Sequence, residues 1–190
     1  MRNILRNRLA LSTVVTTLII LVVSVLLAGV VTYFAINVTS TRVQEESLAL
    51  TKQHVWYNAS SGQSQAALMI INTGGRDIVI DKVTVRGQEA DWNGVAQNVT
   101  YLVTEESISS DLAFIYDGIV GKDMADITDV IGIGSLSSAT TDVTVQSGKT
   151  VILYVSSPDS ITINDIGLTV ALTVFTSQAM YYKETNVQAV

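Results

Sequence analysis

The chain has 190 residues, enough for one domain with its own core and a further segment, but too few for two full-sized domains. It contains no cysteine, which excludes disulfides, cysteine-ligated metal sites and thiol catalysis. Its 11 basic and 17 acidic side chains give a net charge of −6. Three of the basic residues lie in the first eight positions, so the remainder is strongly acidic and offers no electrostatic footprint for nucleic acid.

The N-terminal part is dominated by an apolar run. No charged residue lies between Arg8 and Arg42, and residues 9–36 are apolar apart from a few Ser and Thr. A run of this length predicts a membrane-spanning helix. The basic residues before it predict that the N-terminus stays in the cytoplasm and that the following chain crosses to the outside.

We expect three parts along the chain: a short basic leader at residues 1–10, an N-terminal helix at 11–53, and a β-sandwich at 54–190. The helix is extended to residue 53 because residues 37–53 are polar but rich in helix-forming residues. From residue 54 onward, β-branched and apolar residues alternate with polar ones and are punctuated by turn residues. Strands are predicted at 54–58, 64–73, 77–87, 98–104, 141–147, 150–156, 166–176 and 180–188.

The predicted fold class is therefore α+β, a long N-terminal hydrophobic α-helix followed by an immunoglobulin-like all-β sandwich. Turn residues at 72–75 and 176–179 predict hairpins. Residues 105–140 fit the strand pattern poorly, so we expect an insertion there, with room for one short helix.

The fate of the apolar run has three interpretations. A secretory signal has an apolar region of about 7–15 residues and a small-residue cleavage site, and this run is much longer. An uncleaved anchor needs only the length and the charge asymmetry. In the third interpretation the helix packs against other helices. Small and hydroxyl residues that allow close helix approach lie near one stripe, although such hydroxyls can also bond to their own helix: Thr13, Thr17, Ser24, Ala28 and Thr32.

Residues 8–42, RLALSTVVTTLIILVVSVLLAGVVTYFAINVTSTR, resemble the start of archaeal type IV pilin-like proteins, including the archaeal adhesion pilins. The resemblance extends over about residues 1–55. It implies that a prepilin-peptidase-like protease cuts the leader between Ala10 and Leu11. It further implies that the retained helices pack into the core of a homopolymeric filament, built by an assembly ATPase and a polytopic membrane platform, with the β-sandwich displayed outside.

The function expected from these features is that of a structural subunit, not an enzyme. The subunit would be inserted in the cytoplasmic membrane and then assembled into an extracellular filament whose sandwiches serve adhesion. One alternative is an uncleaved, single-span surface protein similar to the sandwich-bearing anchors of archaeal motility filaments. A tethered enzyme or solute-binding protein would need a convergent polar pocket, and the sequence indicates none.

Three asparagines lie in N-glycosylation sequons on the predicted outer side: Asn37, Asn58 and Asn98. Four acids cluster in the insertion: Asp117, Asp123, Asp126 and Asp129. Such acids can hold Ca²⁺, or they can form an ordinary solvated face of a short helix. His54 is the only histidine, so no histidine-based metal site or nucleophilic triad is expected, and we interpret His54 as a packing residue. No cofactor is expected.

Overall fold

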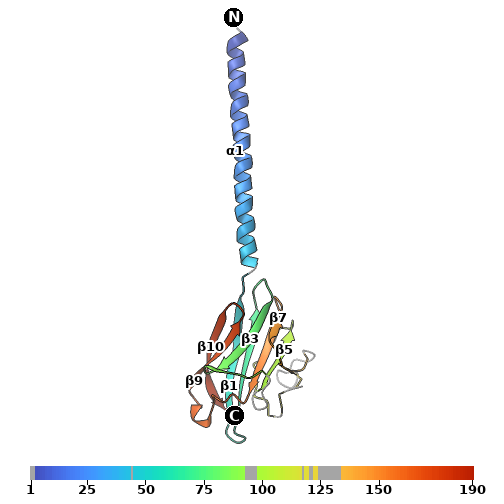
Figure 1. Ribbon diagram of the computed structural model, residues 1–190, viewed down its shortest axis with the longest axis vertical. Coiled ribbons are helices and arrows are strands. Elements are labelled where there is room, and N and C mark those ends of the chain that lie inside the picture. Colours follow the sequence, from blue (N-terminus) through green and yellow to red (C-terminus); the bar gives the residue numbers. More distant parts are fainter. Residues whose placement is uncertain (1–2, 44, 93–97, 117, 120–121, 124–133) are drawn as a thin grey trace. The chain divides into compact units, whose positions relative to one another are not determined.

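The computed structural model describes residues 3–43, 45–92, 98–116, 118–119, 122–123 and 134–190 (Figure 1). The chain divides into two compact units, Met1–Val43 and Gln44–Val190. Each unit is described by itself below, and the second is called the β-domain.

The first unit is one α-helix, α1, which spans Asn3–Val43. Leucine, alanine, valine and isoleucine make up most of it, and no proline interrupts it. The helix confirms the predicted apolar element, but the predicted end at residue 53 is wrong. Residues 48–53 belong instead to the first strand, because burial of Leu48 and Leu50 in the β-domain core outweighs the helix propensity of this stretch.

All eight predicted strands are present; the predicted bounds of two of them, 98–104 and 150–156, are confirmed, and the other six have shifted ends. The eight strands are β1 (Leu48–Asn58), β2 (Gln63–Asn72), β3 (Ile78–Val85), β5 (Asn98–Thr104), β7 (Val143–Val145), β8 (Thr150–Ser156), β9 (Thr169–Thr176) and β10 (Met180–Ala189). Two further strands of two residues each, β4 (Gln88–Glu89) and β6 (Ser137–Ser138), were not predicted. A short 3₁₀ helix, η1, covers Ile163–Asp165. The described parts of residues 105–140 contain β6 but no helix.

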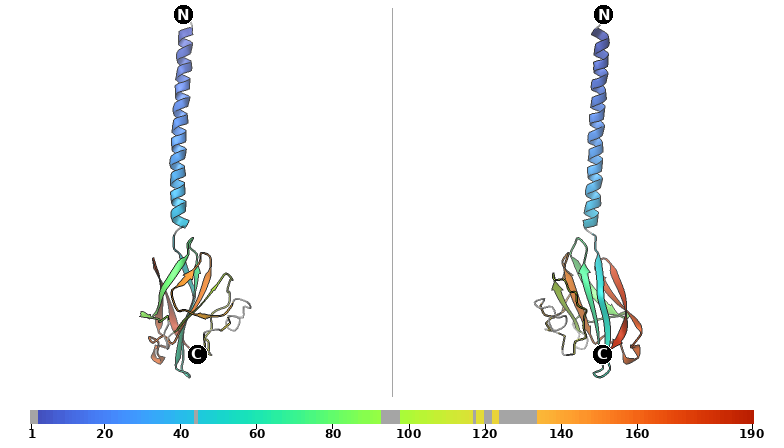
Figure 2. Two further views of the ribbon diagram at one scale, coloured as in Figure 1. Left: turned by 45° about the vertical axis from the view of Figure 1, so that its right-hand side comes forward. Right: turned by 180° about the vertical axis from the view of Figure 1, so that it is seen from behind.

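The described strands form a curled sheet in the order β4-β3-β9-β10-β1-β2-β8-β5-β6, with β7 also paired to β3 (Figure 2). The sheet has two halves, one with β4, β3, β9 and β10 and the other with β1, β2, β8, β5 and β6. β10 joins them, since Met180–Asn186 pair antiparallel with β9 and Val187–Ala189 pair parallel with β1. The predicted hairpin at 176–179 is confirmed, but the one at 72–75 is wrong. β2 and β3 belong to different halves, so residues 73–77 cross from one half to the other.

The inner faces of both halves share one hydrophobic core. Alternate apolar residues of eight strands meet in it, and the largest are almost fully buried, among them Leu68, Ile70, Ile80, Leu153 and Leu172. Each such side chain contributes about 1.5–3 kcal/mol when it is removed from water. This shared core confirms the predicted fold class, a long N-terminal helix followed by an all-β sandwich.

A second hydrophobic cluster lies on the outer face of the β1-β2-β8-β5 half. Outward-facing side chains such as Trp56, Met69 and Ile152 are covered there by side chains of the predicted insertion: Ile108, Leu112, Phe114, Ile115, Ile119 and Leu136. The described part of the insertion is therefore packed onto the sheet. We call residues 108–116 the cover segment.

Candidate functional site

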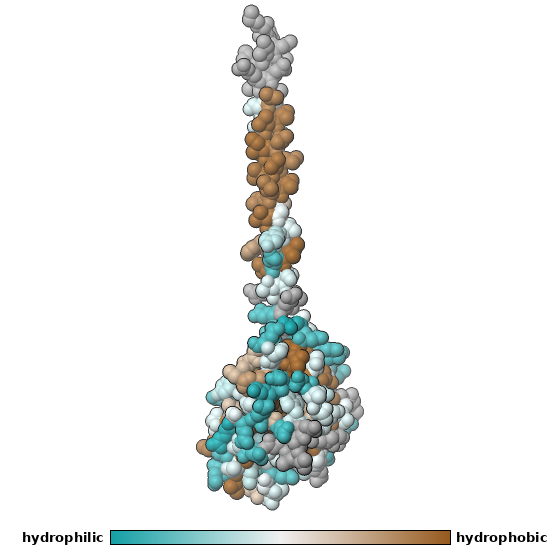
Figure 3. Space-filling view, viewed as in Figure 1, coloured by the Kyte–Doolittle hydropathy of each residue, from teal (hydrophilic) through white to brown (hydrophobic). Residues whose placement is uncertain are grey.

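The surface of α1 is the first candidate site. Leu11–Thr41 is long and apolar enough to cross a membrane by length and composition, and all of its residues are exposed. Figure 3 shows apolar side chains over most of the visible helix surface, whereas the visible face of the β-domain is mainly polar with scattered apolar side chains. A helix that is apolar on all sides is stable when lipid or other helices surround it.

The predicted packing stripe lies on this helix, and its hydroxyl groups bond within the helix. Thr17 Oγ1 donates to the carbonyl of Val14 at 2.9 Å, Ser24 Oγ to Ile20 at 2.7 Å, and Thr32 Oγ1 to Ala28 at 2.8 Å. Thr13 also has a contact. Because these donors are satisfied locally, the stripe can support close helix packing through small size without needing hydrogen bonds to a neighbour. Ala10 and Leu11, the predicted cleavage residues, lie within α1.

The predicted glycosylation sites occupy different environments. Asn37 is exposed on α1, and Asn98 begins β5, with its side chain outside the described residues. Asn58 is buried at the end of β1, and its Oδ1 accepts hydrogen bonds from the amides of Ser60 at 2.8 Å and Ser61 at 3.1 Å. The Asn58 side chain thus holds the β1–β2 turn, and its burial leaves little of it accessible for modification in the folded chain.

The predicted calcium site falls mostly outside the described residues, which include only Asp123 of its four acids. The backbone of Asp123 forms an isolated antiparallel β-bridge with that of Ser135. Within the described residues, no group of three or more acidic or histidine side chains is arranged to hold a metal ion. The calcium site stays a prediction.

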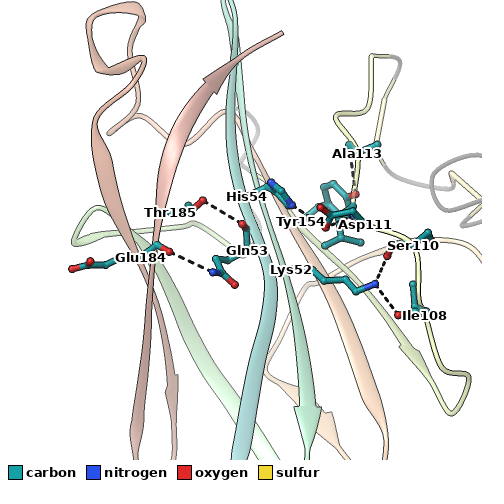
Figure 4. Close-up of polar contacts among 11 residues, drawn as sticks. Lys52, Gln53, His54, Ile108, Ser110, Asp111, Ala113, Tyr154, Glu184 and Thr185 are labelled. Carbon is teal, nitrogen blue, oxygen red and sulfur yellow. Dashed lines mark hydrogen bonds and ion pairs between the residues drawn. The ribbon is translucent and has the colours of Figure 1, made fainter.

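The second candidate site is the cover segment, which β1 holds at an irregular point (Figure 4). The pairing of β1 with β2 shifts register between Thr51 and His54, and Lys52 adopts a left-handed φ of 52°. Such a backbone is costly for a non-glycine residue by about 1–2 kcal/mol. It directs Lys52 Nζ to the carbonyl oxygens of Ile108, at 2.7 Å, and Ser110. The charged Lys52 side chain at the bulge thus holds two backbone carbonyls of the cover segment, and we call this contact the clamp.

Two more strands hold the other end of the cover segment. On β2, the buried side chain of Gln65 bonds both backbone groups of Ile115, donating to its carbonyl at 2.6 Å and accepting from its amide at 3.0 Å. On β8, Tyr154 donates its hydroxyl to the carbonyl of Ala113 at 3.0 Å. Burial raises the pKa of Tyr154 well above its usual range, so this phenol remains a donor.

His54 joins the clamp and an aromatic series. Its Nε2 lies 2.9 Å from Asp111 Oδ1, and its ring stacks on Trp56 with centroids 5.0 Å apart. Trp56 meets Phe114 edge-on at 6.3 Å, and Phe114 meets Tyr116 at 5.0 Å. His54 is thus a packing residue, as predicted, and it also pairs with a carboxylate of the insertion. The aromatic contacts add to the stability of the covered cluster.

The Asp111 carboxyl has a lowered pKa. Partial burial raises this pKa, but the hydrogen bond and charge of His54 lower it more in combination with the Leu112 amide and the charge of Lys52. The other imidazole nitrogen, Nδ1, is buried and has no hydrogen-bond partner among the described residues, and neither does Ser110 Oγ. No serine–histidine–aspartate relay is assembled in the described region, and the polar groups here hold structure together.

The cover segment was missed as a site because its residues lack a regular period. One signal was available, since Ile108, Leu112, Phe114 and Ile115 make this stretch more apolar than an ordinary surface loop. The sequence pattern places Lys52 near the end of the predicted helix and His54 at the start of a predicted strand. Their common role appears only when the bulge places both on the outer face of the sheet.

Comparison with known proteins gives little further guidance. No family model matches this chain, and no curated protein matches it. One similar solved structure is the crystal structure of the ligand binding region of serine-glutamate repeat protein A (SgrA) of Enterococcus faecium. The match covers 77% of this chain and 98% of that chain at 14% identity and a TM-score of 0.31. At these values the similarity supports no inference about this chain.

Proposed function

We propose that the chain is a structural subunit of an extracellular type IV pilus-like filament. The N-terminal helices bundle as the core of the filament, and the β-sandwich is exposed for adhesion. The observation that carries the proposal is the exposed apolar surface of Leu11–Thr41 in a chain whose β-domain has a hydrophobic core of its own. Such a helix needs lipid or other helices around it. When a filament assembles, the helix leaves the lipid and packs against the helices of other subunits.

The order of events follows from the sequence and the resemblance. The basic N-terminus directs insertion with the leader inside, and a prepilin-peptidase-like protease then cuts between Ala10 and Leu11. The assembly machinery moves the trimmed helix from the membrane into the bundle. The acidic surface of the β-domain keeps the outside of the filament soluble.

A second candidate is an uncleaved, single-span surface protein. The hydrogen bonds within α1 favour it, because the stripe hydroxyls are satisfied without a partner helix. In this case α1 keeps its first ten residues and remains in lipid, and the β-domain is a tethered surface module.

The intact mass of protein sheared from native cells separates the two candidates. A polymeric, sheared species that begins at Leu11 is expected for the filament subunit. A full-length chain found only in the membrane fraction would overturn the filament proposal and favour the anchor.

Two sets of variants test the steps. Thr17→Leu with Ser24→Leu is expected to impair assembly while insertion continues, and Val22→Leu with Val23→Leu is the matched control outside the stripe. Unchanged filaments in the first variant would remove the stripe from the mechanism. Ala10→Asp is expected to block trimming and retain the chain in the membrane, and normal shedding would show that the cut lies elsewhere.

A further inference from the structure

The first described residues of the β-domain, Glu45–Ser47, have no regular secondary structure but are held by hydrogen bonds. We call them the connector. The carbonyl of Ser47 accepts hydrogen bonds from the amides of Thr73, at 2.9 Å, and Gly74, at 3.0 Å. The hydroxyls of Ser47 and Thr73 lie 3.0 Å apart. The connector is therefore docked on the crossover at residues 73–77.

Gly74 makes this docking possible through its missing side chain. A Cβ atom at this position would lie 2.7 Å from the carbonyl oxygen of Glu45 and 2.8 Å from the amide nitrogen of Ser47. Both are backbone atoms, so the clash cannot be relieved by the movement of a flexible side chain. Glycine is needed here for close approach of two backbone segments.

The crossover is fixed from beneath by Asn72, which is fully buried. Its side-chain Nδ2 donates to the carbonyls of Arg76, at 2.9 Å, and Val145, at 3.1 Å. Its Oδ1 accepts a hydrogen bond from the backbone amide of Gly74 at 3.0 Å. The hydroxyl of Ser147 donates to the Gly74 carbonyl at 2.6 Å. The surface that receives the connector is thus preformed by both β2 and the β7–β8 turn.

The opposite side of the connector contacts the β9–β10 hairpin. The Glu46 carboxylate accepts a hydrogen bond from the Thr176 hydroxyl. Burial and the Glu46 charge raise the pKa of Tyr181 on β10 above its usual range, which reflects how close this phenol lies to the connector. The connector is therefore tied to the β2–β3 crossover on one side and to the β9–β10 hairpin on the other.

We infer that Asn72, the crossover at residues 73–77 and Thr176 form a socket that locks the connector, so that β1 cannot separate from the sandwich starting at Leu48. The role of the socket rests on the proposed function, because β1 carries a load only when α1 is held in a filament or membrane. Under such a load the connector would pull on both halves of the sandwich together, and the socket resists the opening of β1 from its exposed end.

Glutamyl endopeptidase cleavage after Glu45 and Glu46 tests the socket on the full chain in detergent. The fragments that begin at Glu46 and Ser47 are followed by mass. Gly74→Ala is expected to accelerate this cleavage about tenfold, because the added Cβ expels the connector while the core stays folded. The control is Gly87→Ala, which strains the turn between β3 and β4 at a φ of 79° but places its Cβ in open space. Its cleavage is expected to stay within about twofold of the parent chain.

Equal cleavage of the parent chain and Gly74→Ala would overturn the socket. If Gly74→Ala fails to fold, Thr73→Ala replaces it, since it removes the hydroxyl contacts to Ser47 without adding atoms. It is expected to accelerate cleavage about threefold, and an unchanged rate would overturn the socket. The assay uses dispersed monomers, so a faster cleavage together with absent filaments would support the socket and reject the filament proposal.

Discussion

The two units of this chain use apolar residues in opposite ways. In α1, every residue from Leu11 to Thr41 is exposed, whereas in the β-domain the apolar residues of eight strands pack into one core. The β-domain thus has what an independent fold requires, and the helix has a surface that water does not stabilise. The apolar residues of α1 are therefore available to lipid or to other helices, whereas those of the β-domain stabilise its own fold.

The strongest test of this contrast is to separate the units. The chain of residues 45–190 is expected to be soluble, monomeric and cooperatively folded, while the full chain requires detergent or lipid. The connector is kept so that its docking on the crossover is preserved. Sedimentation and circular dichroism of both chains provide the measurement. An aggregated or unfolded 45–190 chain would show that the β-domain depends on α1.

A pair of truncated leucines tests the contrast at single residues. Leu153 is almost fully buried in the shared core, and Leu153→Ala is expected to lower the free energy of unfolding of the β-domain by about 2–5 kcal/mol. Leu21 is exposed on α1, and Leu21→Ala is expected to leave that free energy unchanged. Urea denaturation in detergent, followed by tryptophan fluorescence, measures both. Similar losses in the two variants would refute the independence of the units.

The sequence predicted the elements whose signals are local. The uncharged run predicted α1, and alternating patterns predicted all eight longer strands, because each of these signals lies within the segment itself. The boundary at residues 48–53 was misplaced, since helix propensity there is overruled by the burial of Leu48 and Leu50 against distant strands.

The remaining errors share one physical cause. Asn72 and Gly74 have hairpin composition, yet they serve a crossover whose partners lie at Ser47 and Val145. The clamp on the cover segment likewise pairs residues more than 50 positions apart, as in the contact of Lys52 with Ile108. Such contacts follow from the pairing order of the strands, which local sequence patterns do not reveal.

The β-domain itself contains a second contrast, between its inner core and its covered outer face. The outer face depends on polar clamps, so Gln65→Ala is expected to weaken it more than an ordinary surface change. The substitution leaves both backbone groups of Ile115 without their partner in a buried place, at a cost of about 1–3 kcal/mol. Hydrogen exchange is expected to accelerate at Ile115 and remain unchanged at Val174 in the inner core. Uniform acceleration at both would show that the two layers unfold as one.

The smallest effect concerns the charge at the edge of the same face. Because the pKa of Asp111 is lowered in the folded state, its carboxylate stabilises the fold above the unfolded-state pKa, and this contribution is lost as pH falls through the folded-state pKa. The side chain is 67% exposed, so solvent screening limits the contribution to about 0.5 kcal/mol or less.

Asp111→Asn removes the titration but keeps an oxygen that can accept from the Leu112 amide. Its free energy of unfolding is therefore expected to lie slightly below that of the parent at pH 6 and to converge with it near pH 2.5. The comparison between the two chains cancels the titration of other carboxyls, among them Asp165, whose pKa is lowered by its hydrogen bonds to Thr162. Urea denaturation at both pH values measures the difference. A constant gap between the chains would mean that Asp111 acts through geometry alone, and that the neutral hydrogen bonds of Gln65 and Tyr154 hold the cover segment.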